Sequence, residues 1–226
     1  MRIIRIISVL LLLSGKIISQ PSLMVDLGVG FYEPALTGIE DNEQFPLQTT
    51  LTKNILLDFG VSYQVFHNTR IGYTNRSSHD FGKIKNEAIF YRSFVYQSIF
   101  FETFFIAKKR MEWNFSVAPI WSRGSIMLNT RSNESQEDWN DLLDSFGNRS
   151  IALASMDAMK SDWFGFSSMI GFRYYLLSWI AADIKMGYMY QFYDPEQWRL
   201  QGQQVYGPEL DIDELPILTA KLVFCW

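Results

Sequence analysis

The segment LTAKLVFCW, residues 218–226, alternates strictly between an apolar row and a mixed row. The apolar row holds Leu218, Ala220, Leu222, Phe224 and Trp226, while Thr219, Lys221, Val223 and Cys225 form the other row. Successive side chains of a β-strand point to opposite faces, so this pattern predicts a strand with one apolar face. The rest of the chain repeats the same two-residue rhythm after a short leader.

Seven further segments show this alternation, at about residues 23–32, 50–66, 70–74, 87–106, 111–122, 164–174 and 180–191. The connections after the second, fourth and sixth segments are short, whereas the connections after the odd-numbered segments are long and polar. Outer-membrane barrels have short periplasmic turns and long external loops. We therefore predict an all-β, antiparallel up-and-down transmembrane β-barrel of eight strands, with both termini on the periplasmic side. The segment 87–106 exceeds the 9–11 residues that a crossing strand needs, so ten strands remain the alternative.

Residues 1–19 have the pattern of a signal peptide. Arg2 and Arg5 provide a positive start, Ile6–Leu13 is mostly apolar, and Ser19 suits a cleavage site. A membrane anchor is the alternative, but the apolar run is shorter than the roughly 20 residues that span a bilayer. We expect two parts, a signal peptide over 1–19 and an outer-membrane barrel domain over 20–226.

Charge and composition exclude two classes of protein. Loss of Arg2, Arg5 and Lys16 with the leader changes the formal net charge from −4 to −7, which argues against a nucleic-acid partner. No later run of 18 apolar residues exists, which excludes a helical membrane protein. Yet 16% of the residues are aromatic, and a barrel can turn such residues toward lipid. The single cysteine, Cys225, excludes an internal disulfide and is expected to be a buried filler.

The chain resembles the small eight-stranded outer-membrane barrels of Gram-negative bacteria, the OmpA/OmpX-like or "outer membrane protein beta-barrel" group. The resemblance rests on the leader, the alternation, the glycine-containing first strand VDLGVGF (25–31) and the closing KLVFCW (221–226). It implies a location in the outer membrane, with outer-membrane lipid and lipopolysaccharide as neighbours. The ending is similar to the signal that the barrel assembly machinery reads, with Phe224 and Trp226 as its aromatic residues. The group shares an architecture rather than an activity, so it transfers no catalytic residue.

Ten charged residues are predicted to face the lumen, five acidic and five basic. They are Asp26, Asp58, Arg70, Arg92, Glu102, Glu112, Arg173, Asp183, Lys185 and Lys221. An eight-stranded barrel is just wide enough for side chains to fill, and unpaired buried charge is very costly. These charges are expected to pair and close the lumen. A narrow, gated, porin-like path for ions or small solutes is the alternative function.

The predicted external loops are acidic and contain aromatic residues. Asp211, Asp213 and Glu214 form the tightest group of carboxylates, although they lack calcium-loop spacing. Four loop aromatics could bind a partner, dip into the lipid interface or cap the barrel mouth: Trp139, Phe146, Trp198 and Tyr206. The loops are the expected site of any extracellular ligand at the cell surface.

Catalysis has weak support in the sequence. Of the two histidines, His67 falls in a predicted periplasmic turn, and His79 lies beside Ser77, Ser78 and Asp80. Catalysis by histidine requires a nucleophile and an orienting acid within hydrogen-bond reach. No cofactor or metal signature is present. We expect a structural or surface-interaction protein, not an enzyme. A lipid-modifying enzyme and a soluble lipocalin-like barrel, whose large residues would point inward, are the remaining alternatives.

Overall fold

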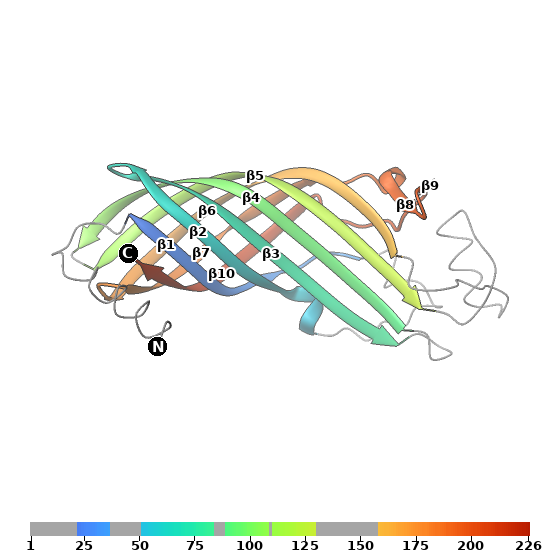
Figure 1. Ribbon diagram of the computed structural model, residues 1–226, viewed down its shortest axis with the longest axis horizontal. Coiled ribbons are helices and arrows are strands. Elements are labelled where there is room, and N and C mark those ends of the chain that lie inside the picture. The colour runs from blue at the N-terminus through green and yellow to red at the C-terminus, as the bar shows by residue number, and fades with distance from the viewer. Residues whose placement is uncertain (1–21, 37–50, 84–88, 109, 130–157) are drawn as a thin grey trace, which may run out of the picture.

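The alternating segments form one antiparallel sheet that closes on itself, in a computed structural model that describes residues 22–36, 51–83, 89–108, 110–129 and 158–226 (Figure 1). The wall consists of β1 (Leu23–Tyr32), β2 (Ile55–Phe66), β3 (Thr69–Lys83), β4 (Ile89–Lys108), β5 (Met111–Asn129), β6 (Ala158–Leu177), β7 (Ile180–Phe192) and β10 (Glu214–Cys225). Each strand pairs with its neighbour along the chain, and β1 pairs with β10 to close the barrel. The expected eight-stranded barrel is confirmed.

The long segment that left the strand count open is one strand. β4 pairs with β3 from Ile89 to Thr103, and with β5 over almost its full length. The two remaining strands, β8 (Trp198–Leu200) and β9 (Gln203–Val205), form a short hairpin beside the outer part of β6. Single turns of 3-10 helix, η2 (Leu51–Asn54) and η3 (Pro195–Gln197), precede β2 and β8. No helix in the described residues is long and apolar enough to cross a bilayer.

Several predicted loop boundaries are wrong because the strands continue beyond the alternating pattern. Residues 76–83, 123–129 and 158–161 lie outside the predicted segments but belong to β3, β5 and β6. The long connection after the seventh segment contains β8 and β9. On the outside of β3 the side chains become polar at Asn75, Ser77 and His79, so the hydrophobic signal ends while the backbone ladder continues. β5 passes through Pro119 without a shift in register.

The outer wall of the barrel is apolar. Large hydrophobic side chains that point away from the interior are exposed on every wall strand, among them Leu27, Leu57, Phe101, Phe115, Ile170, Met186 and Leu222. A soluble lipocalin-like barrel would turn these residues inward, so that alternative is wrong. Aromatic residues lie at both ends of the apolar band, with Trp121 and Phe164 toward one end and Trp179 and Trp226 toward the other. This is the surface of a barrel embedded in lipid.

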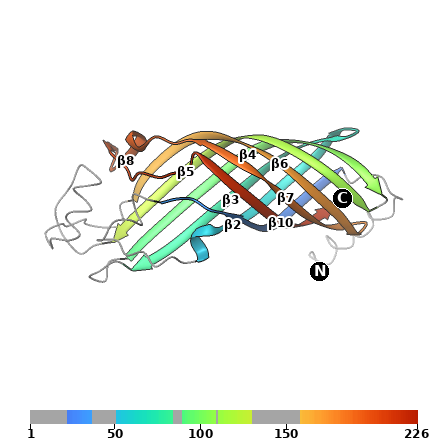
Figure 2. The ribbon, with the colours of Figure 1, turned by 180° about the vertical axis from the view of Figure 1, so that it is seen from behind.

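The two ends of the barrel differ, and we name them by their connections. The turn end has the tight connections at 67–68 and 178–179, and there Leu23 and Trp226 exchange backbone hydrogen bonds of 3.1 and 2.9 Å. The loop end carries β8 and β9 and the outer parts of β3, β4, β5 and β6, which extend beyond β1, β2, β7 and β10 (Figures 1 and 2). The interior therefore runs from a compact turn end to a more elaborate loop end.

Candidate functional site: the barrel interior

Six charged side chains form one cluster inside the turn-end half of the barrel. The Arg70 guanidinium donates to both carboxylate oxygens of Glu112, at 2.6 and 2.8 Å, and to Glu102 Oε1 at 2.9 Å. Arg173 donates to Glu112 Oε1 at 3.1 Å and, through Nε, to Asp183 Oδ2 at 2.8 Å. Bidentate bonds between arginine and carboxylate are among the strongest that side chains make.

Strand register explains why these six side chains meet. Arg70 lies opposite Glu102, Glu112 lies opposite Arg173, and Arg173 lies opposite Asp183 on successive strands. Lys185, two residues after Asp183, contacts Glu102 across the lumen. The cluster contains three acids and three bases, all at most 7% exposed, so each buried charge has an opposite charge beside it. Tyr175 adds a hydroxyl bond to Glu112 Oε2 at 2.8 Å.

A second cluster of two acids and two bases lies near β1, β2, β3 and β10. Asp58 accepts from Arg76 Nε at 2.9 Å and from Thr74 Oγ1 at 2.8 Å. Lys221 Nζ lies 2.9 Å from Asp58 Oδ1 and 2.8 Å from Asp26 Oδ1. The Asp58–Arg76 pair is again a register pair, between β2 and β3.

A small polar cavity of about 20 Å³ separates the two clusters. Charged residues of both clusters line it, together with Ser62, Ser98, Ser116 and Ser167. This volume suits about one water molecule. The middle of the interior is therefore polar and almost filled.

Two buried charged residues of β3, Arg76 and Asp80, are missing from the predicted set of lumen charges. Asp80 lies opposite Arg92 on β4, and Arg92 is the one predicted charge that lies apart from the others. Arg76 was assigned to a loop because the hydrophobic alternation of β3 ends before it, yet it is buried and paired with Asp58. Arg92 was predicted to join the other lumen charges. It lies instead toward the loop end, where it donates to Lys53 O at 3.4 Å and stacks 4.8 Å from the Phe94 ring centre. No acid forms an ion pair with Arg92 within the described ranges. The other nine predicted charges lie in the two clusters.

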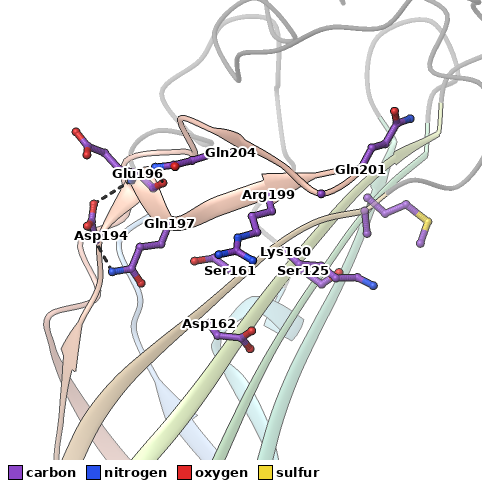
Figure 3. Close-up of a pocket in the computed structure, with 13 residues that line it drawn as sticks. Ser125, Lys160, Ser161, Asp162, Asp194, Glu196, Gln197, Arg199, Gln201 and Gln204 are labelled. Carbon is purple, nitrogen blue, oxygen red and sulfur yellow. Dashed lines mark hydrogen bonds between the residues drawn. The ribbon is translucent and has the colours of Figure 1, made fainter.

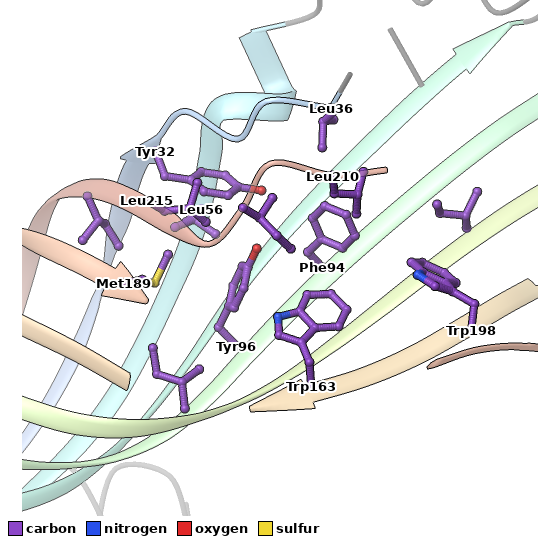
Figure 4. Packing of buried hydrophobic residues seen from close by; sticks show 14 of the residues in the cluster. Tyr32, Leu36, Leu56, Phe94, Tyr96, Trp163, Met189, Trp198, Leu210 and Leu215 are labelled. Atoms are coloured by element: carbon purple, nitrogen blue, oxygen red, sulfur yellow. The ribbon is translucent and has the colours of Figure 1, made fainter. Parts of the chain in front are cut away.

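The loop-end half of the interior is filled by an apolar cluster, which we call the cap (Figure 4). Its members come from the barrel wall, from β8 and β9, and from the stretch before β10. They include Tyr32, Leu56, Phe94, Tyr96, Ile120, Trp163, Met189, Trp198, Leu200, Val205, Leu210, Ile212 and Leu215. The sequence offered three roles for Trp198, and the structure assigns it to the cap.

Trp198 is a large and fully buried member of the cap. Its Nε1 donates to the Tyr193 hydroxyl at 2.7 Å, which donates in turn to Pro208 O at 2.5 Å. A side chain at position 207 would overlap the Trp198 ring, so glycine is required there. Burial raises the pKa of Tyr193, which favours the neutral hydroxyl that both bonds use. Tyr206, in contrast, is 40% exposed, and Trp139 and Phe146 lie outside the described residues.

Two of the three neighbours of His79 in the sequence, Ser78 and Asp80, lie on the other face of its strand. His79 lies on the outer face of β3 and shares a hydrogen bond of 2.8 Å with the Tyr91 hydroxyl. Ser78 and Asp80 are buried on the opposite face of the same strand. The side chains of Asp211, Asp213 and Glu214 do not come together as a group that could hold a metal ion. No such group of three or more side chains occurs among the described residues.

The predicted assembly signal lies at the closure of the barrel. The rings of Phe224 and Trp226 lie on the outer wall at the turn end, with centroids 6.5 Å apart. Cys225, between them in the sequence, is buried, and its thiol forms no disulfide.

Comparisons with known proteins agree with this architecture. No protein-family model matches the chain, and no curated protein is significantly similar in sequence. Among solved structures, Ail, the attachment invasion locus protein of Yersinia pestis, in complex with the heparin analogue sucrose octasulfate, matches with a TM-score of 0.52 at 7% identity. That match covers 92% of this chain and 100% of Ail.

A major outer membrane protein of Thermus thermophilus matches with a TM-score of 0.52 at 10% identity, over 91% of this chain and 98% of that one. Neisserial surface protein A matches with a TM-score of 0.50 at 8% identity, over 90% of this chain and 97% of that one. At these identities the matches establish the fold and nothing finer. The chain therefore has the fold of the small eight-stranded outer-membrane β-barrels, and its apolar wall belongs in the outer membrane.

Proposed function

We propose that this protein is a closed outer-membrane barrel with a structural or surface-interaction role. The observation that carries the proposal is the filling of the interior. Two neutralised charge clusters occupy the turn-end half and an apolar cap occupies the loop-end half, with a cavity for about one water between the clusters. A lumen filled in this way leaves recognition to the outer surface.

The external loops are the parts that would bind a partner. The stretch between β7 and β10 carries Asp194, Glu196, Glu209, Asp211 and Asp213, and further acids lie in 130–157, outside the described residues. We infer that an extracellular ligand would meet an acidic surface. The same charge, together with the net charge of −7 expected after loss of residues 1–19, favours partners other than nucleic acid.

A conductance measurement tests the closed barrel against its rival, a narrow gated channel. The refolded full-length protein should show no steady single-channel current in a planar bilayer. Arg173→Ala removes a cation that contacts three acids, Glu102, Glu112 and Asp183, and should raise the frequency of transient openings. A steady current through the unaltered protein would establish the channel and refute the closed barrel.

Two further expectations belong to this proposal. We infer a non-enzymatic role, supported by the separation of His79 from Ser78 and Asp80, and unchanged lipid A after deletion of the gene would agree with it.

We also infer that Phe224 and Trp226 are read by the barrel assembly machinery. Truncation of Trp226 should lower the amount of heat-modifiable barrel in the outer-membrane fraction, whereas Trp179→Ala, at the same end of the barrel, should not.

A further inference from the structure

A groove crosses the outer wall at the loop end, beside the β8–β9 hairpin. One part, of about 560 Å³, is lined by the aromatic side chains of Trp121, Phe164 and Phe192 and by polar residues that include Arg123 and Asp162. The adjoining part, of about 830 Å³, is lined mainly by polar and charged residues of β5, β6, η3, β8 and β9. Both parts include Asp162 and Gln197, so they are continuous.

The register of the strands orders the chemistry of this groove. Trp121, Phe164 and Phe192 form one row across β5, β6 and β7. A second row lies four residues closer to the loop end on β5 and β6. It consists of Ser125 on β5, Lys160 on β6 and Arg199 on β8. At about 3.3 Å per residue, these rows lie roughly 13 Å apart along the strands. The groove therefore passes from the aromatic edge of the lipid-facing wall to a charged part beyond it, whose lining includes the cations Lys160 and Arg199.

The two cations of this part of the groove lie side by side, and neither forms an ion pair within the described part of the chain. Lys160 and Arg199 lie directly opposite each other on β6 and β8. Two positive charges in this arrangement repel each other, which destabilises the strand pair. Three acids line the same part of the groove, Asp162, Asp194 and Glu196. Asp162 accepts from Arg123 at 2.6 Å, and Asp194 accepts from Glu196 N at 2.9 Å. Among the described residues, no carboxylate forms an ion pair with either cation.

The close-up of this part of the groove shows the same division. Arg199 and Lys160 lie near Ser125 in the middle of the groove, whereas Asp194 and Glu196 lie to one side (Figure 3). Amide side chains of Gln197 and Gln204 complete the polar lining. The site therefore offers positive charge and hydrogen-bond donors at its centre.

We propose that this groove binds a phosphorylated lipid of the outer leaflet, of the lipid A class. Its phosphate would lie between Lys160 and Arg199, whose repulsion an anion would relieve. Its acyl chains would lie against the aromatic row, which continues the apolar wall. A soluble anion would use only the basic part of the groove, and this is why we assign a lipid. The proposal needs the barrel to sit in the outer membrane but does not need a closed lumen, so the conductance test is independent of it.

The test uses the full-length barrel refolded in uncharged maltoside micelles and titrated with bisphosphorylated lipid A, with binding followed by native mass spectrometry. The double variant Lys160→Gln/Arg199→Gln should bind at least tenfold more weakly than the unaltered protein. Arg110→Gln removes one exposed cation at the turn end and should bind within twofold of it. Heat-dependent gel mobility verifies that each variant is folded, and the exchanged pair Lys160→Arg/Arg199→Lys should retain binding.

Two altered ligands identify what is recognised. Lipid A without phosphates should bind the unaltered protein as weakly as bisphosphorylated lipid A binds the double variant. The deacylated, phosphorylated disaccharide should bind at least tenfold more weakly than the intact lipid. Equal binding of that disaccharide would identify a soluble anion and overturn the assignment to lipid. Full binding by a folded double variant would overturn the site itself.

Discussion

The two halves of the barrel interior are stabilised in different ways. In the turn-end half, charged side chains on the wall strands pair with the residues opposite them, as Arg173 does with Glu112 and Asp183. In the loop-end half, apolar side chains pack together, and many come from outside the wall, as Trp198 and Leu210 do. The first half depends on the matching of charges and the second on the filling of space. Substitutions should therefore have different consequences in the two halves.

The largest effect should follow from breaking the charge balance of the turn-end half. Arg173→Met keeps much of the side-chain volume but leaves Asp183 and part of the Glu102 and Glu112 charge uncompensated. Removal of one partner of a buried ion pair costs about 3–5 kcal/mol. We expect a loss of that size in the free energy of unfolding, measured by reversible urea titration of the barrel in lipid vesicles.

The double variant Arg173→Met/Asp183→Met provides the control for this prediction. It removes a cation and an anion together, and buried pairs can often be replaced by apolar residues at little cost. The double variant should therefore be more stable than Arg173→Met alone. If it is less stable, lost packing rather than unpaired charge dominates in this half.

Overpacking should have the next largest effect, and two glycines allow the halves to be compared directly. A Cβ at Gly60 would lie 2.5 Å from Asp26 Oδ2, a carboxylate held by Lys221, whereas a Cβ at Gly30 would lie 3.2 Å from Leu56 Cβ in the cap. Gly60→Ala should lower the free energy of unfolding by about 2 kcal/mol, and Gly30→Ala by less. Equal losses in the same urea titration would show that the charged half can adapt as well as the cap.

A smaller and more local effect is expected in the cap. Trp198→Phe removes the indole N–H that donates to Tyr193 and leaves a small void, for a loss of about 1 kcal/mol. Because the cap is partly built from the β8–β9 hairpin, hydrogen exchange should accelerate at the loop end and stay unchanged around Arg70. Acceleration along the whole barrel would mean that the two halves unfold as one unit.

The sequence was sufficient to predict the wall of the barrel and most of its charged interior. Alternation identifies which side chains face inward, and long-range pairing then follows from strand order, because neighbours along the chain are neighbours in the sheet. The hydrophobic signal fails where a strand leaves the lipid and becomes polar on its outer face. That is why the continuation of β3 was missed, and Arg76 with it.

The cap could not be predicted in the same way. Its largest fully buried side chain, Trp198, lies in a polar stretch of sequence between β7 and β10, and nothing local distinguishes a buried tryptophan there from an exposed one. The surroundings of Arg92, a residue of the wall, could not be predicted either. Alternation predicts that its side chain points into the barrel, but not how far along the barrel axis it lies. Its surroundings depend on the segments folded over the loop end, such as η2, whose Lys53 carbonyl it contacts.

The smallest effect should come from an ion pair of similar geometry outside the interior. Arg123 Nε lies 2.6 Å from Asp162 Oδ1, as short as the Arg70–Glu112 contact, yet both side chains are 68% exposed. Exposed pairs contribute roughly 0–1 kcal/mol because water screens them and ordering two side chains costs entropy. Arg123→Gln should therefore change the free energy of unfolding by less than about 0.5 kcal/mol in uncharged micelles, and added salt should not alter the result. A loss close to that of Arg173→Met would mean that distance, rather than burial, determines the strength of these contacts, and the contrast between interior and surface would fail.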